Sequence, residues 1–424
     1  MNQQTQLGKN TLWMILSRFG AQGLTVVFTI VLARRLGSAG FGEYAFIAAI
    51  LYVANTLTTF GTDMLIIREI AAQNNLSRLS AALIVQLALS ALFITLVWIA
   101  GSSIPNQNLE TITALKMYSL VLIPLAFFTV FTTALRGKQN MGAYTLLNIV
   151  VAGLQVGIVF LSRFSIMDLA VFLVLVQTIA AIAAGFICAI TVPNFIQAWR
   201  EPFADLPRLI RETAPIAFIA LLGMLYQRLS VTMLSTMRGP TDAGLFSAAA
   251  RMVEASKGIH IAVFAALYPA MAFARTDFAN QNRWIQTFKL SWKTLIAAAM
   301  VGALILSIFS APLTALLYGS QFDASANVLG ILGWMLIPFT INTYLTLSFL
   351  AANKERFVVR ALAVSLLGLL ILNLWWIPLK GPEGAAWAAL SAESIQSVIL
   401  LVSERVKFGI RGKENELSDL PREI

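Results

Sequence analysis

The chain has 424 residues, of which 58% are hydrophobic and only 12% are charged. A soluble protein carries roughly twice that charged fraction, so this composition excludes an ordinary soluble domain and indicates an integral membrane protein. With one histidine and one cysteine, the sequence also excludes a disulfide framework and argues against a structural metal site.

Hydrophobic runs separated by short polar breaks extend from near Asn10 to about Val406, and twelve of them are long enough to cross a bilayer core. Such a crossing takes about 20 apolar residues. The runs are continuous, whereas the strands of a membrane β-barrel alternate apolar and polar residues. We therefore predict an all-α integral membrane protein with 12 transmembrane helices. The predicted spans are 11–33, 43–66, 80–100, 113–135, 142–162, 168–191, 214–236, 243–272, 290–310, 326–351, 358–379 and 385–406.

The distribution of Lys and Arg predicts the orientation of these spans, because cytoplasmic segments of membrane proteins carry an excess of both residues. We expect both termini in the cytoplasm and the protein in the inner membrane. This bias also explains most of the net charge of +10 without a nucleic-acid partner. With a cytoplasmic N-terminus, the segments on the opposite side hold only five of the 30 basic residues: Arg34, Arg35, Arg163, Arg238 and Lys380.

The longest internal connection lies near the middle of the chain and mixes prolines, charges and aromatic residues. This mixture is typical of a linker that lies in the cytoplasmic membrane interface. We expect residues 193–213 to form this linker and to act as a hinge. They would separate an N-terminal six-helix lobe at 1–192 from a C-terminal six-helix lobe at 214–407, which a cytoplasmic tail at 408–424 follows.

Two pairs of glycines suggest an internal repeat. Gly37 and Gly42 open the second predicted span, and Gly239 and Gly244 open the eighth at a constant offset of 202 residues. We expect these glycines to make tight turns between spans 1 and 2 and between spans 7 and 8.

A repeated tripeptide supports the same symmetry. Leu122-Ile123-Pro124 lies in span 4 and Leu336-Ile337-Pro338 lies in span 10, at an offset of 214 residues. Both prolines are expected to kink their helices. Because six spans per half is an even number, the halves enter the membrane in the same direction. The two lobes should then be related by a parallel repeat, with a site between them.

Span 8 carries four ionisable residues spaced by three: Arg251, Glu254, Lys257 and His260. The first three fall within an arc of roughly 120° on a helix, and His260 drifts further round. Three charges on one face are costly in lipid, so they should face either a polar cavity or one another in an ion network that locks helices together. His260 is either a proton carrier or a structural histidine.

Other polar residues within spans are candidates for the same cavity. Arg18 and Gln22 are four positions apart in span 1 and therefore share a face. Arg228 lies in span 7. Cations in spans 1, 7 and 8 occupy matching places in the two halves. A cavity that they line would be positive and would suit an anionic substrate such as a phosphate group.

Two carboxylates are candidates for coupling or cavity roles. Asp63 lies near the inner end of span 2, where it could also simply pair with Arg68. Glu393 lies in the middle of span 12. It would be either a protonated carboxyl that is hydrogen-bonded to a neighbour or a site for a coupling ion.

The sequence lacks a P-loop, a Rossmann glycine pattern and the HExxH and CxxC motifs. We therefore expect no catalytic residues, no metal and no cofactor, and no ATP hydrolysis by this chain. An ion gradient, the membrane potential or consumption of the product downstream would drive any transport. A membrane scaffold or an enzyme are rival interpretations, which the internal charges and the missing motifs respectively weigh against.

Several short motifs resemble those of Wzx-type polysaccharide transporters, which belong to the multidrug/oligosaccharidyl-lipid/polysaccharide exporter superfamily. The resemblance covers nearly the whole chain in length and number of spans and is sharpest over residues 10–75. The motifs are Leu32–Gly37, Phe41–Tyr44, Phe60-Gly61, Ile66–Ala71 and Leu135–Gln139.

The resemblance implies a flippase that moves undecaprenyl-pyrophosphate-linked oligosaccharides across the cytoplasmic membrane by alternating access, for surface polysaccharides such as the O-antigen of lipopolysaccharide. Its partners would be this substrate, membrane lipid, and a polysaccharide polymerase with its chain-length machinery. Helices 1, 2, 7 and 8 would line the cavity. The alternative is a cation-coupled exporter of drugs or metabolites. The candidate binding residues are Arg18, Gln22, Arg228, Arg251 and Lys257, and the candidate coupling or cavity residues are Asp63, Glu254, His260 and Glu393.

Overall fold

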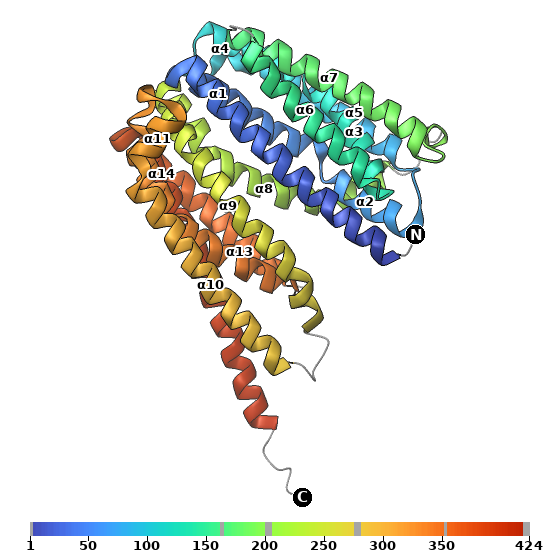
Figure 1. Ribbon diagram of the computed structural model, residues 1–424, viewed down its shortest axis with the longest axis vertical. Coiled ribbons are helices and arrows are strands. Elements are labelled where there is room, and N and C mark those ends of the chain that lie inside the picture. The colour runs from blue at the N-terminus through green and yellow to red at the C-terminus, as the bar shows by residue number, and fades with distance from the viewer. Residues whose placement is uncertain (1–2, 162–164, 200–205, 275–280, 352–353, 419–424) are drawn as a thin grey trace, which may run out of the picture. The chain divides into compact units, whose positions relative to one another are not determined.

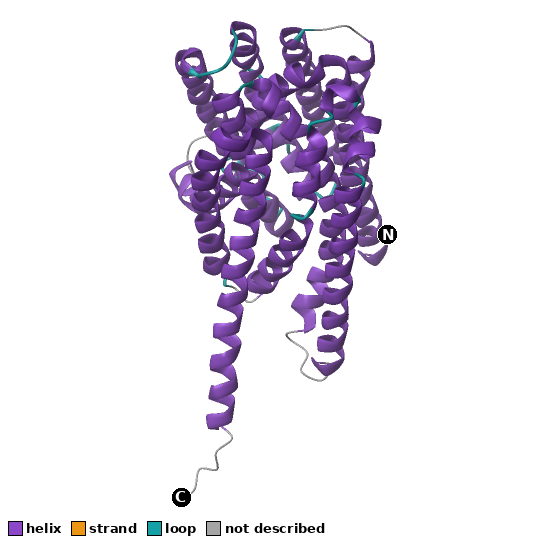
Figure 2. Ribbon diagram, turned by 90° about the vertical axis from the view of Figure 1, so that its left-hand side faces the viewer, coloured by secondary structure: helices purple, strands orange, loops and turns teal. Residues whose placement is uncertain are grey.

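The computed structural model describes residues 3–161, 165–199, 206–274, 281–351 and 354–418, without side chains at 3–12, 14–19, 161, 259–274, 281–291, 351 and 405–418. All regular elements in these ranges are helices (Figures 1 and 2). The α-helices are α1 (Gln3–Thr59), α2 (Thr62–Gln73), α3 (Leu79–Ala100), α4 (Leu109–Ser119), α5 (Leu122–Gly137), α6 (Met141–Leu161), α7 (Ile166–Thr191), α8 (Leu206–Arg238), α9 (Pro240–Ala274), α10 (Gln281–Ile308), α11 (Ser310–Tyr318), α12 (Ser325–Gly333), α13 (Leu336–Ala351) and α14 (Glu355–Ser418).

The first helix, α1, is a hairpin of two helical arms. Its 57 residues would span about 86 Å if straight, nearly three times a bilayer core. Gly37 breaks it with φ 69°, a left-handed conformation that favours glycine. The rings of Phe28 and Tyr44, on opposite arms, have centroids 5.8 Å apart, although a straight helix would separate these residues by about 24 Å. The predicted turn between spans 1 and 2 is therefore confirmed.

The last helix, α14, folds back in the same way. Gly381 interrupts its 64 residues with φ 55°. Ser365 and Ala392 lie on opposite sides of this break, 27 positions apart. The Ser365 hydroxyl donates a 2.6 Å hydrogen bond to the carbonyl of Ala392, so the two arms run side by side. The arms of α14 are the predicted spans 11 and 12.

The number of spans agrees with the prediction. In the described part of the chain, seven helices are long and apolar enough to cross a membrane, and two bent pairs, α10 with α11 and α12 with α13, pass the same test together. Because α1 and α14 each supply two arms, these helices account for eleven of the twelve predicted spans, and α9 covers the remaining one, span 8. The predicted end of span 2 at residue 66 is wrong. The helix ends at Thr59, because Phe60 and Gly61 both have positive φ, and α2 follows.

The repeat landmarks occupy equivalent places in the structure. Gly239 has φ 97° and separates α8 from α9, as Gly37 separates the arms of α1. Pro124 and Pro338 each stand third in a helix, α5 and α13, and a break precedes each helix. A proline clashes with the carbonyl four residues earlier, which here falls within the break. The expected kinks are thus real and lie one turn before each proline.

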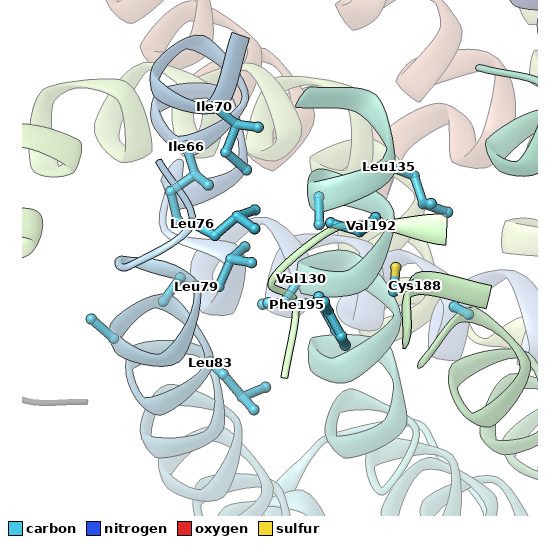
Figure 3. Packing of buried hydrophobic residues seen from close by; sticks show 14 of the residues in the cluster. Ile66, Ile70, Leu76, Leu79, Leu83, Val130, Leu135, Cys188, Val192 and Phe195 are labelled. Atoms are coloured by element: carbon cyan, nitrogen blue, oxygen red, sulfur yellow. The ribbon is translucent and has the colours of Figure 1, made fainter. Parts of the chain in front are cut away.

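The chain forms two compact units, Met1–Ser247 with Leu317–Phe322 and Ala248–Leu316 with Asp323–Ile424. One hydrophobic core of the first unit gathers mainly aliphatic side chains from α2, α3, α5 and α7 (Figure 3). Among them, Leu79 and Leu135 are fully buried. The lobe boundaries at residues 192 and 213 stay predictions.

The described flanks of the predicted linker are docked on this core. Phe195 packs edge-on against Phe131 of α5 and against Trp199, with centroids 5.6 and 5.7 Å away. On the other flank, Leu209 is fully buried. Residues 206–213, which we expected in the linker, are the first turns of α8. Any hinge must therefore act on segments that are already anchored to the first unit.

Candidate functional site

Arg228 lies in α8 and packs against a tyrosine from the second arm of α1. Its guanidinium carbon is 4.6 Å from the centre of the Tyr52 ring. A guanidinium over an aromatic face gains about 0.5–2 kcal/mol from the ring quadrupole. This offsets part of the roughly 2.5–3.5 kcal/mol that a cation in the middle of a span costs. The tyrosine ring therefore helps to hold a positive charge inside the membrane region of the first unit.

The charged face of α9 belongs to the second unit and divides into two parts. Arg251 and Glu254 form an ion pair at 3.0 Å. The ammonium of Lys257 instead lies 4.6 Å from the centre of the Phe339 ring of α13. Lys257 makes no ion pair with the side chains that the structure describes. The three charges thus do not form one continuous ion network, and Lys257 repeats the cation-on-ring arrangement of Arg228.

Asp63 lies in the first turn of α2 and faces α5. Its carboxylate is 3.8 Å from the guanidinium of Arg136, which also lies 5.5 Å from the centre of the Tyr144 ring of α6. Among the described ion pairs, Asp63 is joined to Arg136 and not to Arg68, its expected alternative partner. Arg136 stands in the Leu135–Gln139 motif, but sequence spacing alone gave it no role.

Glu393 is buried in the second unit with only 5% of its surface exposed. The amide nitrogen of Asn342 on α13 donates to its carboxylate at 3.1 Å and to its backbone carbonyl at 2.9 Å. The Ser397 hydroxyl in turn donates to the Asn342 side-chain oxygen at 2.8 Å. Burying a carboxyl this deep is costly unless it has such hydrogen-bond partners. Asn342 and Ser397 were missed in the sequence because polar uncharged residues are common within spans.

The remaining predicted site residues are only partly described. Gln22 is exposed on the first arm of α1. Arg18 lies on the same arm and His260 on α9, but their side chains fall outside the described part of the structure. Their predicted roles stay predictions.

A further charged cluster was missed entirely. Arg78, only 8% exposed, donates from one guanidinium nitrogen to Glu69 of α2 at 2.7 Å and to Glu212 of α8 at 2.8 Å. Sequence reasoning treated Arg78 as one of the cytoplasmic charges. Its partner Glu212 is 134 positions away, which no local pattern reveals.

The internal cations have the same kind of support in both units. Each unit holds at least one cation that rests on an aromatic ring within an apolar span. Over the residues that the structure describes, no group of three His, Cys, Asp or Glu side chains gathers to hold a metal ion. The fold and its long apolar helices define a multi-pass membrane protein.

Comparison with known proteins identifies the family. A family described as "Polysaccharide biosynthesis protein" matches residues 7–275. This match covers more than half of the chain, so the protein belongs to this family, which includes the Wzx-type flippases, as its motifs predicted. A comparison with curated protein sequences found no match.

Solved structures of membrane transporters share the fold. A multidrug resistance MATE family transporter in an inward-facing conformation superposes with a TM-score of 0.78 at 13% identity, over 92% of this chain and 96% of that one. The lipid II flippase MurJ in an inward closed conformation gives 0.76 at 14% identity, over 97% and 94%. A transporter from Pyrococcus furiosus gives 0.66 at 13% identity, over 95% of each chain. At these identities the likeness shows the fold alone.

Proposed function

We propose that this protein is a flippase for undecaprenyl-pyrophosphate-linked oligosaccharides, acting by alternating access in the cytoplasmic membrane. The observation that carries the proposal is the pair of ring-supported cations, Arg228 on Tyr52 and Lys257 on Phe339, within apolar helices. Membership of a polysaccharide biosynthesis family supports a glycan-bearing substrate. The substrate would deliver glycans to a polymerase and its chain-length machinery beyond the membrane.

The proposed binding mode uses the difference between the two cations. A guanidinium presents planar, paired N–H donors that match phosphate oxygens, whereas an ammonium acts as a compact point charge. Arg228 of the first unit would therefore bind phosphate oxygens directionally, and Lys257 and Arg251 of the second unit are proposed as further binding residues that supply positive charge. Arg18 and Gln22 are proposed to contribute from the first arm of α1.

The membrane potential would favour export of such a head group. Moving one negative charge outward releases about 2.3 kcal/mol per 100 mV when the inside is negative. Export in this direction requires the proposed orientation, with both termini in the cytoplasm. No ATP hydrolysis or bound cofactor is needed for this driving force.

The second candidate is a cation-coupled exporter of drugs or metabolites, and the buried Glu393 favours it. A carboxyl held by Asn342 inside the second unit is suited to exchange a proton or cation as its surroundings change. Asp63, Glu254 and His260 are further proposed coupling or cavity groups. The two candidates differ in substrate, and a flippase could also use such coupling.

A reconstitution assay tests the flippase proposal. The purified protein is placed in liposomes with undecaprenyl-pyrophosphate-N-acetylglucosamine carrying a fluorophore, and a membrane-impermeant quencher reports which leaflet holds the probe. We expect protein-dependent movement, slowed about 10-fold or more by Arg228→Gln, because a hydrogen bond to a charged group contributes about 1.5–3 kcal/mol. The matched control is Arg356→Gln at an exposed arginine of α14. Probe that stays in its original leaflet would contradict the proposal.

A further inference from the structure

The two hairpin turns predicted as repeat landmarks meet through a backbone contact that only glycine permits. A methyl group added at Gly42 would overlap the Pro240 carbonyl and lie 2.8 Å from the backbone nitrogen of Gly244. A methyl group at Gly244 would overlap the Ser38 carbonyl and lie 3.0 Å from the backbone nitrogen of Gly42. Ser38 and Pro240 are 202 positions apart, as are Gly42 and Gly244. The two contacts are therefore repeat mates of each other.

Three side-chain hydrogen bonds also join the two halves of the chain near these turns. Asn106, in the loop before α4, donates its amide to the carbonyl of Thr236 at the end of α8, at 2.7 Å. Its neighbour Gln107 donates to the carbonyl of Ser235 at 3.0 Å. Arg34 at the end of the first arm of α1 also donates to a carbonyl of the second half, that of Leu317, at 2.7 Å.

The hairpin-turn partners in these bonds share the offset of the glycines. Arg34 and Thr236 are 202 positions apart. Asn106 and Leu317 each lie beside a short 3-10 turn, Gly101–Ser103 or Ser320–Phe322, that precedes α4 or α12. Asn106 and Gln107 of the first half thus bind the hairpin turn of the second half, and Leu317, near the end of α11 in the second half, binds the hairpin turn of the first half. The aromatic Phe322, which is fully buried, packs edge-on against Phe41 at 6.0 Å and fixes one side of the contact.

We propose that these contacts form a gate, the hairpin clasp, made of residues 34–44, 106–107, 235–244 and 317–322. The inference rests on the proposed function, in which the clasp closes the outward-facing end of the export path. Because glycine has no side chain, the two turns can meet backbone to backbone when the gate is closed. Because the contacts are reciprocal, neither half can release the other alone. The clasp therefore opens in one cooperative step.

A cross-linking experiment tests the clasp without any substrate. Asn106→Cys and Thr236→Cys are introduced together in a Cys188→Ser background and treated in membranes with a short bifunctional methanethiosulfonate. A maleimide-polyethylene glycol reagent then counts the free thiols after denaturation. We expect efficient cross-linking in this parent protein. Adding Gly42→Ala or Gly244→Ala should lower the yield of cross-linked protein about 10-fold. Each single substitution should lower it nearly as much as the two substitutions together.

The matched control is Gly153→Ala, at a helical glycine of α6 with open space around it. It should leave the cross-linking yield unchanged. Unchanged cross-linking in both Gly42→Ala and Gly244→Ala would overturn the clasp. If each single variant lost only part of the cross-linking yield and the two losses added up in the double variant, the clasp would not open cooperatively.

A second measurement keeps the inference testable if an alanine variant does not fold. Cross-linked parent protein should lose movement of the fluorescent pyrophosphate probe described above, and a reductant should restore it. Transport that continues at full cross-linking would overturn the gate. If the parent cross-links and responds to the glycine variants but never moves the probe, the clasp stands and the substrate proposal fails.

Discussion

At the scale of single residues, the internal charges are stabilised mainly by neighbours distant in sequence. The sequence identifies which charges fall within apolar spans, because hydropathy and helical spacing are local properties. It could not identify Tyr52 or Phe339 as their partners, since aromatic residues in spans pack on almost any neighbour. It also left open whether Arg251, Glu254 and Lys257 form one network, and the structure separates Lys257 from the ion pair.

Tyr52 is expected to position Arg228 through its ring and not through its hydroxyl. Tyr52→Phe keeps the aromatic face and should leave probe movement near the wild-type rate. Tyr52→Leu removes the cation–π attraction of about 0.5–2 kcal/mol and should slow movement several-fold. Initial rates in liposomes compare the two variants. Equal rates in Tyr52→Leu and the wild type would show that the ring does not position the cation.

Glu393 should matter for stability through its hydrogen bond to Asn342. Glu393→Gln keeps a carbonyl oxygen for this bond, so its thermal unfolding in detergent should resemble the wild type. Glu393→Leu leaves the Asn342 amide without that acceptor and should cost about 1–3 kcal/mol. If Glu393 also couples transport to protons, Glu393→Gln should abolish stimulation by a pH gradient while folding normally. Equal unfolding temperatures for Leu and Gln would contradict the stabilising role.

At the scale of elements, glycines and prolines determine where the helices break. Gly37, Gly239 and the two Leu-Ile-Pro tripeptides were interpretable because their backbone effects are intrinsic to the residues. The end of span 2 was not, because Phe60 adopts positive φ, which nothing in a phenylalanine predicts. The docking of the linker flanks was also missed, because it depends on tertiary contacts with α5 and α3.

Arg78 should anchor α8 to α2 within the first unit. Arg78→Ala leaves the carboxylates of Glu69 and Glu212 facing each other, so we expect a lower unfolding temperature. Arg208→Ala is the matched control, since Arg208 pairs with the same Glu212 but is 71% exposed and exposed ion pairs contribute little. Differential scanning fluorimetry in detergent distinguishes the two. Equal losses from both substitutions would refute the anchoring role.

At the scale of the whole molecule, the twelve-span repeat was predictable and the architecture of the gate was not. Span number follows from hydropathy, and the parallel relation follows from six spans per half. The glycines of the repeat were predicted to make turns, yet two of them, Gly42 and Gly244, also contact each other. Such a contact between distant turns leaves no periodic signal in the sequence.

Recognition of a pyrophosphate by the internal cations is tested most directly by a comparison of head groups. Liposomes receive two fluorescent probes with the same sugar and polyprenyl chain, one joined by pyrophosphate and one by an uncharged linkage. We predict that the wild type moves the pyrophosphate probe at least about 10-fold faster and that Arg228→Gln with Lys257→Gln removes this preference. Equal initial rates for the two probes in the wild type would contradict the account.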